Sequence, residues 1–303
     1  MDWRYKALLQ SAISFLPAGH RLNYVFQRQV TRSLPVDEAK FVKIVAIAER
    51  HVQLLKRHGR RPLETATFYE FGAGWDLIVP LSLYALGVER QILVDIRRLS
   101  RPSLVNDTID RLGALPATSA LRRRPQRRLP AGPAFFVRLK EFYGIDYRAP
   151  CDARWTGLGD QCVDYITSTN TLEHVPAPDV LPILRECQRL LRRDGVMTSQ
   201  IDYQDHYSYF DPKISAYNFL RYSEREWRKY SQSIHYQNRL RHPDYLRMIG
   251  EAGFQVFEQQ LAEGTPADQA IIDQLPLDER FSQYDRRELA IRSAFLAVGK
   301  RPA

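Results

Sequence analysis

One short stretch constrains the fold more than any other, Thr67-Phe68-Tyr69-Glu70-Phe71-Gly72-Ala73-Gly74. An apolar, aromatic-rich run reaches the acid Glu70, a Gly-x-Gly turn follows at once, and an apolar segment then begins at Leu77. Glycines at Gly72 and Gly74 let the backbone turn tightly and let a ligand lie against bare amide groups. The stretch predicts the first strand–turn–helix crossover of an α/β sheet, with a nucleotide-type ligand at the turn. A Gly-x-Gly turn alone is a weak signal, so the prediction depends on the segments that follow it.

The length and composition are those of a globular protein with one large domain and a smaller appendage. The chain has 303 residues, of which 44% are hydrophobic and 26% charged. Its three cysteines show no metal-ligand spacing, so we expect reduced thiols and a cytoplasmic location. No apolar run approaches the roughly 20 residues that cross a bilayer, and the first 16 residues are too polar for a signal peptide.

The formal net charge of +9 raises the question of an anionic partner. Much of the excess lies in Arg122-Arg123-Arg124-Pro125-Gln126-Arg127-Arg128, which prolines flank on both sides. No aromatic side chains alternate with these arginines to stack on bases. The pattern therefore favours a solvated loop over a nucleic-acid contact.

The hydrophobic pattern divides the chain into a helical cap over residues 1–62 and a main domain over residues 63–303. In the cap, Asp37 and Glu38 mark the start of a helix and Gly59 marks its end. The cap either covers a substrate pocket or mediates homodimerisation. The main domain alternates strands with helices, and an aromatic, charged insert interrupts it at about residues 204–240. The predicted strands cover residues 68–71, 91–95, 145–147, 163–168, 196–203, 254–259 and 295–300.

Strands that alternate with helices predict a mainly parallel sheet that is covered on both faces. Ligands of such sheets bind beyond the carboxyl ends of the strands, near the point where the strand order reverses. We therefore expect the functional side chains just after each strand.

Four ordered segments resemble the class I S-adenosylmethionine-dependent methyltransferases. They are Glu70–Gly74, Val94-Asp95 about 25 residues later, Asp164–Val175, and Leu190–Val196 with Gly195 at its turn. The resemblance covers roughly residues 62–303 and implies a Rossmann-like sheet of seven strands. The aromatic insert, from Asp205 onward, is similar to a bacterial subgroup that occurs with surface-polysaccharide or natural-product genes.

The chain departs from the family pattern at Asp76, where a third glycine is usual. A short acidic side chain can accept hydrogen bonds from the free amides of a helix's first turn. We therefore expect Asp76 to cap the helix that begins at Leu77. Pro80 is compatible with that helix because it falls within the first turn.

The resemblance implies a binding site for S-adenosylmethionine. Glu70 would hold the ammonium group, and Gly72 and Gly74 would let the methionine portion lie on the backbone. Asp95 would accept hydrogen bonds from the two ribose hydroxyls, as an ionised carboxylate can. Asp152 would accept from the adenine amino group, and Asn170 would lie near the transferred methyl group.

His206 is the preferred catalytic base, because it follows the fifth strand and Asp205 beside it could fix its tautomer. His235, in an aromatic and polar cluster, is the alternative base. Glu173 and His174 by themselves do not make a metal site, and we expect His174 to be structural. Aromatic residues of the insert either line an acceptor site or pack within a lid; they are Tyr207, Tyr209, Phe210, Tyr217 and Trp227.

These expectations predict a methyltransferase that acts on a hydroxyl or amine of a small-molecule or saccharide-type acceptor. An RNA methyltransferase is the first alternative, motivated by the positive charge. A non-catalytic partner protein that keeps the cofactor site is the second. A nucleotide-dependent oxidoreductase would show Gly-x-Gly-x-x-Gly, which the residues from Gly72 to Leu77 lack.

Overall fold

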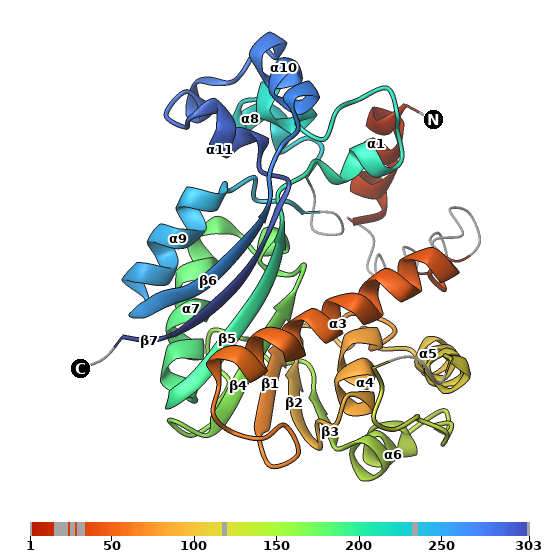
Figure 1. Cartoon of the computed structure of the whole chain (residues 1–303). Coiled ribbons are helices and arrows are strands. Elements are labelled where there is room, and N and C mark those ends of the chain that lie inside the picture. The colour runs from red at the N-terminus through yellow and green to blue at the C-terminus, as the bar shows by residue number, and fades with distance from the viewer. Residues whose placement is uncertain are drawn as a thin grey trace.

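The computed structural model describes residues 2–14, 24, 28, 34–116, 120–231 and 236–301. A seven-stranded sheet runs through the molecule in the order β3-β2-β1-β4-β5-β7-β6 (Figure 1). The strands are β1 (Thr67–Phe71), β2 (Arg90–Val94), β3 (Ile145–Arg148), β4 (Val163–Thr169), β5 (Leu191–Asp202), β6 (Phe254–Ala262) and β7 (Ser293–Lys300). The predicted fold class, a Rossmann-like methyltransferase sheet of seven strands, is confirmed.

The order of the strands places the switch point of the sheet between β1 and β4. Strands β1 to β5 pair in parallel, whereas β7 runs antiparallel between β5 and β6. The chain moves outward from β1 to β2 and β3 and then crosses to the other side of β1. The register sets Glu70 of β1 opposite Thr167 of β4. The carboxyl ends of β1 and β4 therefore border the region where ligands of such sheets bind.

Helices cover both faces of the sheet (Figure 1). On one face, α7 (Ala177–Leu190) and α9 (His242–Glu251) share an apolar core with Tyr69 and Ile166. On the other face, α3 (Glu38–His58) and α4 (Ile78–Ala85) share a core with Phe68 and Tyr165. Neighbouring strand residues point to opposite faces, so the buried apolar side chains of β1 and β4 contribute to both cores. Helices α5 (Pro102–Ala114) and α6 (Ala134–Tyr143) join a third core beside β3.

Helix α3 begins and ends where the sequence predicts. The Asp37 carboxylate accepts a hydrogen bond from the Lys40 amide at 2.7 Å, and Gly59 follows the last turn. The apolar positions of the helix are buried against the sheet; they are Phe41, Val45, Ala48, Val52 and Leu55. The division of the chain at residue 62 stays a prediction.

Two predicted boundaries are corrected. Helix α7 ends at Leu190 and β5 begins at Leu191, whereas the predicted strand began only at residue 196. Leu191 is buried and pairs with Val163 of β4, so strand pairing takes over residues with good helix propensity. Asp76 does not occupy the cap position of α4, because Leu77 does so in the left-handed region, at φ 54°. The Asp76 carboxylate still accepts from the Ile78 amide at 3.4 Å.

A separate layer lies beyond one end of the sheet, and we call it the lid (Figure 1). The predicted insert supplies η3 (His206–Tyr209), η4 (Asn218–Arg221) and α8 (Glu224–Trp227). A second segment, between β6 and β7, adds α10 (Pro266–Gln274), η5 (Glu279–Phe281) and α11 (Arg286–Ala290). Helix α1 (Trp3–Ser14) packs on both through Trp3 and Ala7. The lid is thus built from three parts of the chain, of which the sequence identified the insert and the N-terminal helix.

Buried arginines fasten the lid to the sheet. The Arg241 guanidinium donates to the carbonyls of Tyr203 at 2.6 Å, Leu289 at 2.8 Å and Ile291 at 3.0 Å. It thereby joins the chain after β5 to the chain before β7. Arg239 donates to the carbonyls of Phe219 and Tyr222 within the lid. Buried charge is tolerated at these positions because carbonyl oxygens surround it.

Two features noted from composition can be compared with the structure. The three cysteines form no disulfide, and burial raises the pKa of the Cys187 thiol. None of the helices in the described ranges has the length and apolar character of a membrane span.

Candidate functional site

The turn after β1 combines a close approach with open space. Gly72 and Gly74 adopt left-handed conformations, at φ 77° and 75°. A Cβ atom on Gly72 would lie 2.3 Å from Cγ2 of Thr171, so only glycine lets this turn meet the loop after β4. A Cβ atom on Gly74 would meet no protein atom within 4 Å. Gly74 therefore borders open space in which a ligand could lie against the backbone.

Glu70 is a buried acid at this turn. Its side chain is 3% exposed, and the Thr167 hydroxyl donates to its Oε2 at 3.1 Å. Burial raises the pKa of Glu70 to about 8, since a carboxylate loses solvation when it leaves water. A cationic ligand group would favour the ionised form, so the residue fits the predicted contact with an ammonium group.

Asp95 lies at the same turn, directly after β2. The Arg97 amide donates to its Oδ1 at 3.1 Å, and the Gly74 amide also contacts the carboxylate. Burial raises the pKa of Asp95 to about 6. The structure therefore brings together Glu70, the glycine turn and Asp95, which the sequence placed at the ends of two neighbouring strands.

Asp152 lies next to this group but has a strong partner of its own. The Cys151 amide donates to the Asp95 carbonyl at 2.8 Å, which holds the segment beside β2. Arg154 donates to both oxygens of Asp152, at 2.7 to 3.1 Å, and also to Asp179 at 2.6 Å. The Arg154 guanidinium holds the pKa of Asp152 below its usual range. A contact between Asp152 and adenine stays a prediction. In such a contact the Asp152 carboxylate would accept hydrogen bonds from both adenine and Arg154.

The loop after β4 reaches the glycine turn. Asn170 is exposed in a left-handed conformation, at φ 47°, and its amide donates to the Gln200 carbonyl at 3.0 Å. The Thr171 hydroxyl contacts the carbonyls of Phe71 at 3.5 Å and Gly72 at 3.4 Å. The structure thus places Asn170 beside the turn, and its role near the methyl group stays a prediction.

His206 is paired with an acid, but not with the one that the sequence suggested. Its Nε2 lies 3.3 Å from Oδ2 of Asp202, the last residue of β5. Asp205 is buried and instead caps η3, because its carboxylate accepts from the Tyr207 amide and the Asn218 side chain. The spacing of four residues between Asp202 and His206 was the available sequence signal. His235, the alternative base, lies outside the described residues.

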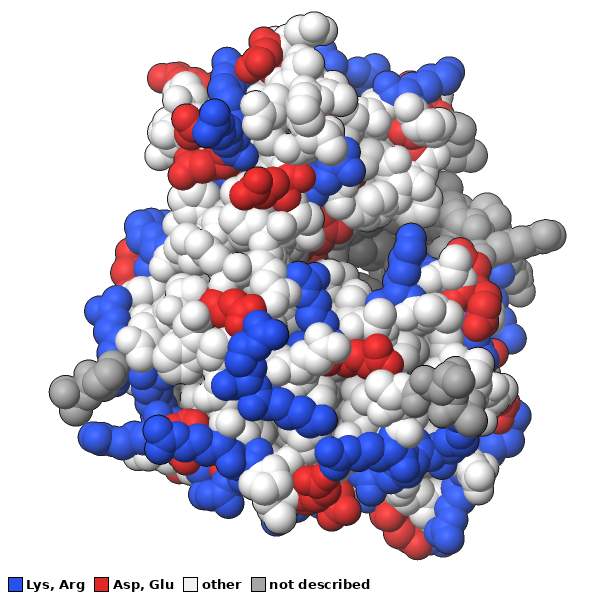
Figure 2. Space-filling view, in the orientation of Figure 1, with Lys and Arg blue, Asp and Glu red and all other residues white. Residues whose placement is uncertain are grey.

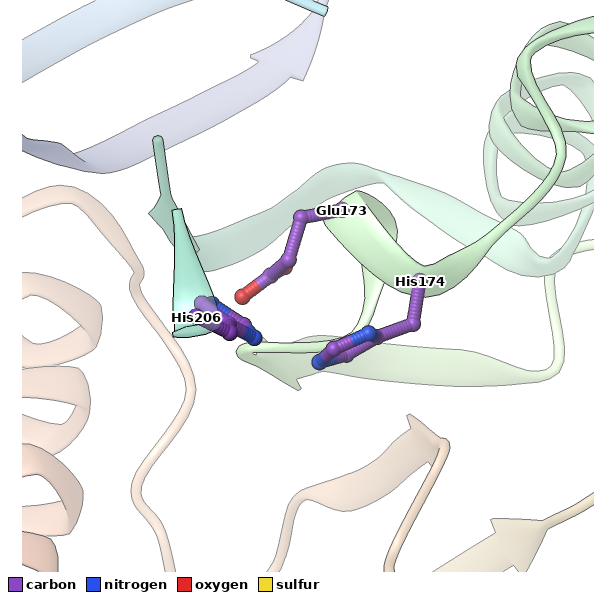
Figure 3. Close-up of side chains that lie close together, drawn as sticks. All are labelled: Glu173, His174 and His206. Carbon is purple, nitrogen blue, oxygen red and sulfur yellow. The ribbon is translucent and has the colours of Figure 1, made fainter. Parts of the chain in front are cut away.

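Glu173, His174 and His206 converge at the ends of β4 and β5 (Figure 3). One ligand atom from each side chain lies within 4.8 Å of the others. The His174 and His206 rings are 4.9 Å apart between centroids. The sequence did not predict this cluster of three side chains, because Glu173 and His174 belong to one loop whereas His206 comes more than 30 residues later.

The three side chains differ in their surroundings. Desolvation by the surrounding protein, followed by the neighbouring His206, lowers the pKa of the His174 imidazole to about 4. Its Nδ1 donates to the Tyr236 carbonyl at 2.7 Å, so the imidazole does form the backbone contact expected of it. Glu173 is 2% exposed, and burial raises the pKa of its carboxyl well above the usual range. The Asp202 amide lies 3.3 Å from its Oε1, whereas Oε2 has no hydrogen-bond partner.

The aromatic residues of the insert divide into two groups. Tyr207, Tyr217 and Trp227 are buried in the lid core, so packing is their role. Tyr209 and Phe210 are 55% and 45% exposed. Tyr209 stacks on His206 with 5.4 Å between ring centroids and donates a hydrogen bond to Asp202. These two remain as candidates for a wall that contacts an acceptor.

The arginine-rich segment is a loop whose Arg122, Arg127 and Arg128 are exposed, but part of it is fastened to α4 and the turn after it. The backbone amides of Arg122 and Arg123 donate to the Ala85 carbonyl. The Arg123 side chain donates to the carbonyls of Tyr84 at 2.8 Å and Val88 at 2.6 Å. Figure 2 shows both basic and acidic side chains on one face of the molecule, and a hollow between the lid and the part below it.

The sheet and a family match define the class of protein. Residues 137–198, from α6 into β5, match the family model described as a methyltransferase domain. The match includes the loop after β4 and ends before the Asp202–His206 pair. Together with the strand order, it confirms the prediction of an S-adenosylmethionine-dependent methyltransferase and leaves the acceptor undefined.

Several solved structures are similar at a low level, and no curated protein matches. One is the 1,6-didemethyltoxoflavin-N1-methyltransferase of Burkholderia thailandensis, with its substrate and S-adenosylhomocysteine bound. It is 15% identical, with a TM-score of 0.47 over 98% of this chain and 89% of that one. A second is a methyltransferase of Methanosarcina mazei, 12% identical, with a TM-score of 0.46 over 82% and 98%. A third is the YcgJ protein of Bacillus subtilis, 17% identical, with a TM-score of 0.45 over 84% and 100%.

Proposed function

We infer that this protein transfers a methyl group from S-adenosylmethionine to a hydroxyl or amine of a small-molecule or saccharide-type acceptor. One observation carries the proposal. Two buried carboxylates, Glu70 and Asp95, flank a turn whose Gly74 borders open space, at the switch point of a parallel sheet.

The residues of this turn suit each part of the donor. Glu70 would be ionised by a bound ammonium group, and Asp95 would accept from the ribose hydroxyls. Gly72 and Gly74 keep the backbone accessible, and the exposed Ile96, directly after Asp95, offers an apolar contact for a base. When bound, S-adenosylmethionine supplies an electrophilic methyl group, so the protein has to align an acceptor with it.

The acceptor would bind in the hollow under the lid, beside the ends of β4 and β5. An alcohol acceptor must lose a proton during transfer, and His206 is the proposed base. Asp202 would hold the His206 ring in place. An amine acceptor would need only to arrive uncharged.

A small acceptor suits these surroundings better than RNA. The arginines from Arg122 to Arg124 are tied to backbone carbonyls and to Glu64, and basic side chains are mixed with acidic ones on the face that Figure 2 shows. An RNA site would require a continuous basic surface along which phosphates could lie. The alternative of a non-catalytic partner protein differs from the proposal only in the absence of turnover.

The donor site is tested by calorimetric titration with S-adenosylhomocysteine. Asp95→Ala removes two charge-assisted hydrogen bonds of about 1.5 kcal/mol or more each, so we expect at least about 100-fold weaker binding. Asp107→Ala is the control, because Asp107 lies on α5 in a weak pair with Arg111. Equal affinity of the wild type and Asp95→Ala would refute the assignment of the donor site.

The acceptor is tested with methyl-labelled S-adenosylmethionine and four panels: saccharides, phenols and alcohols, amines, and mixed RNA. We expect labelled product with a hydroxyl or amine acceptor and none with RNA at physiological salt. Transfer to RNA alone would support the first alternative. Binding of the donor without transfer to any acceptor from the native cell extract would support the non-catalytic alternative.

A further inference from the structure

We propose that Glu173, His174 and His206 form a binding site for a divalent first-row transition-metal ion, and that the acceptor is an oxygen-rich molecule whose hydroxyl binds this ion. The acceptor part rests on the proposed function, whereas the metal site stands on the geometry of three side chains. Figure 3 shows them pointing toward one another from the loop after β4 and the start of η3.

The donor set determines the kind of ion. Two imidazole nitrogens and one carboxylate oxygen suit Zn²⁺, Fe²⁺ or Co²⁺ better than Mg²⁺ or Ca²⁺, which prefer oxygen ligands alone. Three protein ligands leave coordination positions open for water or substrate. The site would therefore bind an exogenous oxygen rather than serve as a closed structural centre.

His174 is oriented as a metal ligand would be. The Tyr236 carbonyl can only accept, so Nδ1 of His174 carries the proton and Nε2 keeps a free lone pair. A backbone carbonyl that fixes the tautomer in this way is the usual outer partner of a metal-bound histidine. Asp202, at 3.3 Å from Nε2 of His206, and the Tyr209 hydroxyl that donates to Asp202 can orient the second imidazole similarly.

Glu173 supplies an independent indication. Its side chain is 2% exposed, and Oε2 is a buried oxygen without a hydrogen-bond partner. Most buried polar atoms in folded proteins have a partner, because an unpartnered one costs free energy. A cation between this oxygen and the two imidazoles would satisfy it.

The separations require only small movements. The candidate ligand atoms lie within 4.8 Å of one another. Bonds of about 2.1 Å hold tetrahedral ligands about 3.4 Å apart, so the widest pair would close by at most about 1.4 Å. Side-chain rotations of His174, which is exposed, can provide this change.

A metal at this point would change how the acceptor loses its proton. An acceptor hydroxyl whose oxygen binds the ion becomes more acidic and releases its proton to water. The oxygen then forms a bond to the methyl carbon while the bond between that carbon and sulfur breaks, leaving a neutral thioether. In the metal-loaded protein His206 is a ligand and does not act as the base; the ion makes the hydroxyl acidic enough for water to accept its proton. One hydroxyl would fill the open position of a tetrahedral site, and a neighbouring hydroxyl, as in a sugar or a catechol, would bind as well when the ion becomes five-coordinate.

The metal site is tested with Co²⁺, without any donor or acceptor. Protein treated with a chelator and then dialysed is titrated with CoCl₂ while the visible absorption is recorded. We expect one equivalent to bind, with absorption bands typical of imidazole coordination. Glu173→Gln and His174→Ala should each weaken binding by at least about 100-fold, and Asp202→Asn by about 10- to 100-fold. His58→Gln, which removes the imidazole at the C-terminal end of α3, should leave Co²⁺ binding unchanged.

Co²⁺ affinity that is the same in the wild type, Glu173→Gln and His174→Ala would overturn the metal site. Circular dichroism and titration with S-adenosylhomocysteine on each variant show whether the fold and donor site persist, since Glu173 and His174 lie outside the proposed donor contacts. A protein that binds the donor but not Co²⁺ keeps the proposed function and loses the metal. A protein that binds Co²⁺ at this site but not the donor keeps the metal site and contradicts the proposed function.

Discussion

The donor side and the acceptor side of the candidate site are built differently. On the donor side, Glu70, Gly72 and Gly74 come from one run of five residues, and Asp95 follows the adjacent strand. On the acceptor side, Glu173 and His174 come from the loop after β4, and His206 comes from the lid. The donor side thus depends on backbone conformation next to a strand end. The acceptor side depends on long-range packing, so the two can be disturbed separately.

The largest expected effect separates turnover from donor binding. His206→Ala removes the proposed base or metal ligand, so we expect turnover to fall by about 100- to 10,000-fold. The affinity for S-adenosylhomocysteine should stay within about two-fold of the wild type, since His206 lies outside the donor contacts. Steady-state kinetics and calorimetry measure the two quantities, with His58→Gln as the control. A parallel loss of donor affinity would show that the two sides are not independent.

The next effect concerns the turn after β1. Gly72→Arg places a Cβ atom against Thr171 at 2.3 Å and forces a long side chain into a left-handed position. We expect donor affinity to fall by at least about 100-fold in calorimetry. Gly132→Arg is the matched control, because Gly132 has φ 86° and open space around its Cα. Gly132→Arg places the same side chain in a left-handed position but should bind S-adenosylhomocysteine with the affinity of the wild type. An equal loss of affinity in both variants would mean that backbone strain alone causes it.

Donor binding should also depend on pH, through the two buried acids. The pKa of Glu70 is raised to about 8 and that of Asp95 to about 6, so both are protonated at low pH before the donor binds. Because a bound ammonium group favours ionised Glu70, affinity should fall about ten-fold per unit as pH drops from 8 to 6. Below pH 6, protonation of Asp95 adds to the slope.

Titrations with S-adenosylhomocysteine between about pH 5 and about pH 9 measure this dependence. This range includes the pKa values of about 8 for Glu70 and about 6 for Asp95. Glu70→Gln cannot ionise, so the slope between pH 6 and 8 should disappear while the slope that Asp95 causes remains. A wild-type affinity that does not change with pH would exclude Glu70 as the partner of the ammonium group.

The smallest expected effect tests the side-chain hydrogen bond between Thr167 of β4 and Glu70 of the donor turn. Thr167→Val removes the hydroxyl that donates to Glu70 and should raise the pKa of that carboxyl further. A loss of about 1 kcal/mol corresponds to about five-fold weaker donor binding near pH 7. Thr108→Val removes a comparable hydroxyl, bonded to the Asp76 carbonyl, and serves as the control. An unchanged affinity in Thr167→Val would mean that the hydroxyl does not tune Glu70.

Most of the sheet could be predicted from the sequence because local patterns specify it. Runs rich in β-branched and aromatic residues mark β1 and β4, and polar or glycine residues follow them, Gly72 after β1 and Asn170 after β4. The errors lie where long-range pairing or backbone strain decides. Leu191 joins β5 through its pairing with Val163, and Leu77 takes a left-handed cap position that no propensity favours for leucine.

The fold class, and the glycines and acids at the ends of β1 and β2, could be read from the amino-acid sequence alone, because each depends on residues within a few positions of a strand end. Only the tertiary structure paired His206 with Asp202, docked the arginine-rich segment and assembled the lid from three segments. It also brought Glu173 and His174 to His206. Such contacts join residues that are far apart in the chain, and their geometry is fixed by the packing of the whole sheet rather than by local pattern.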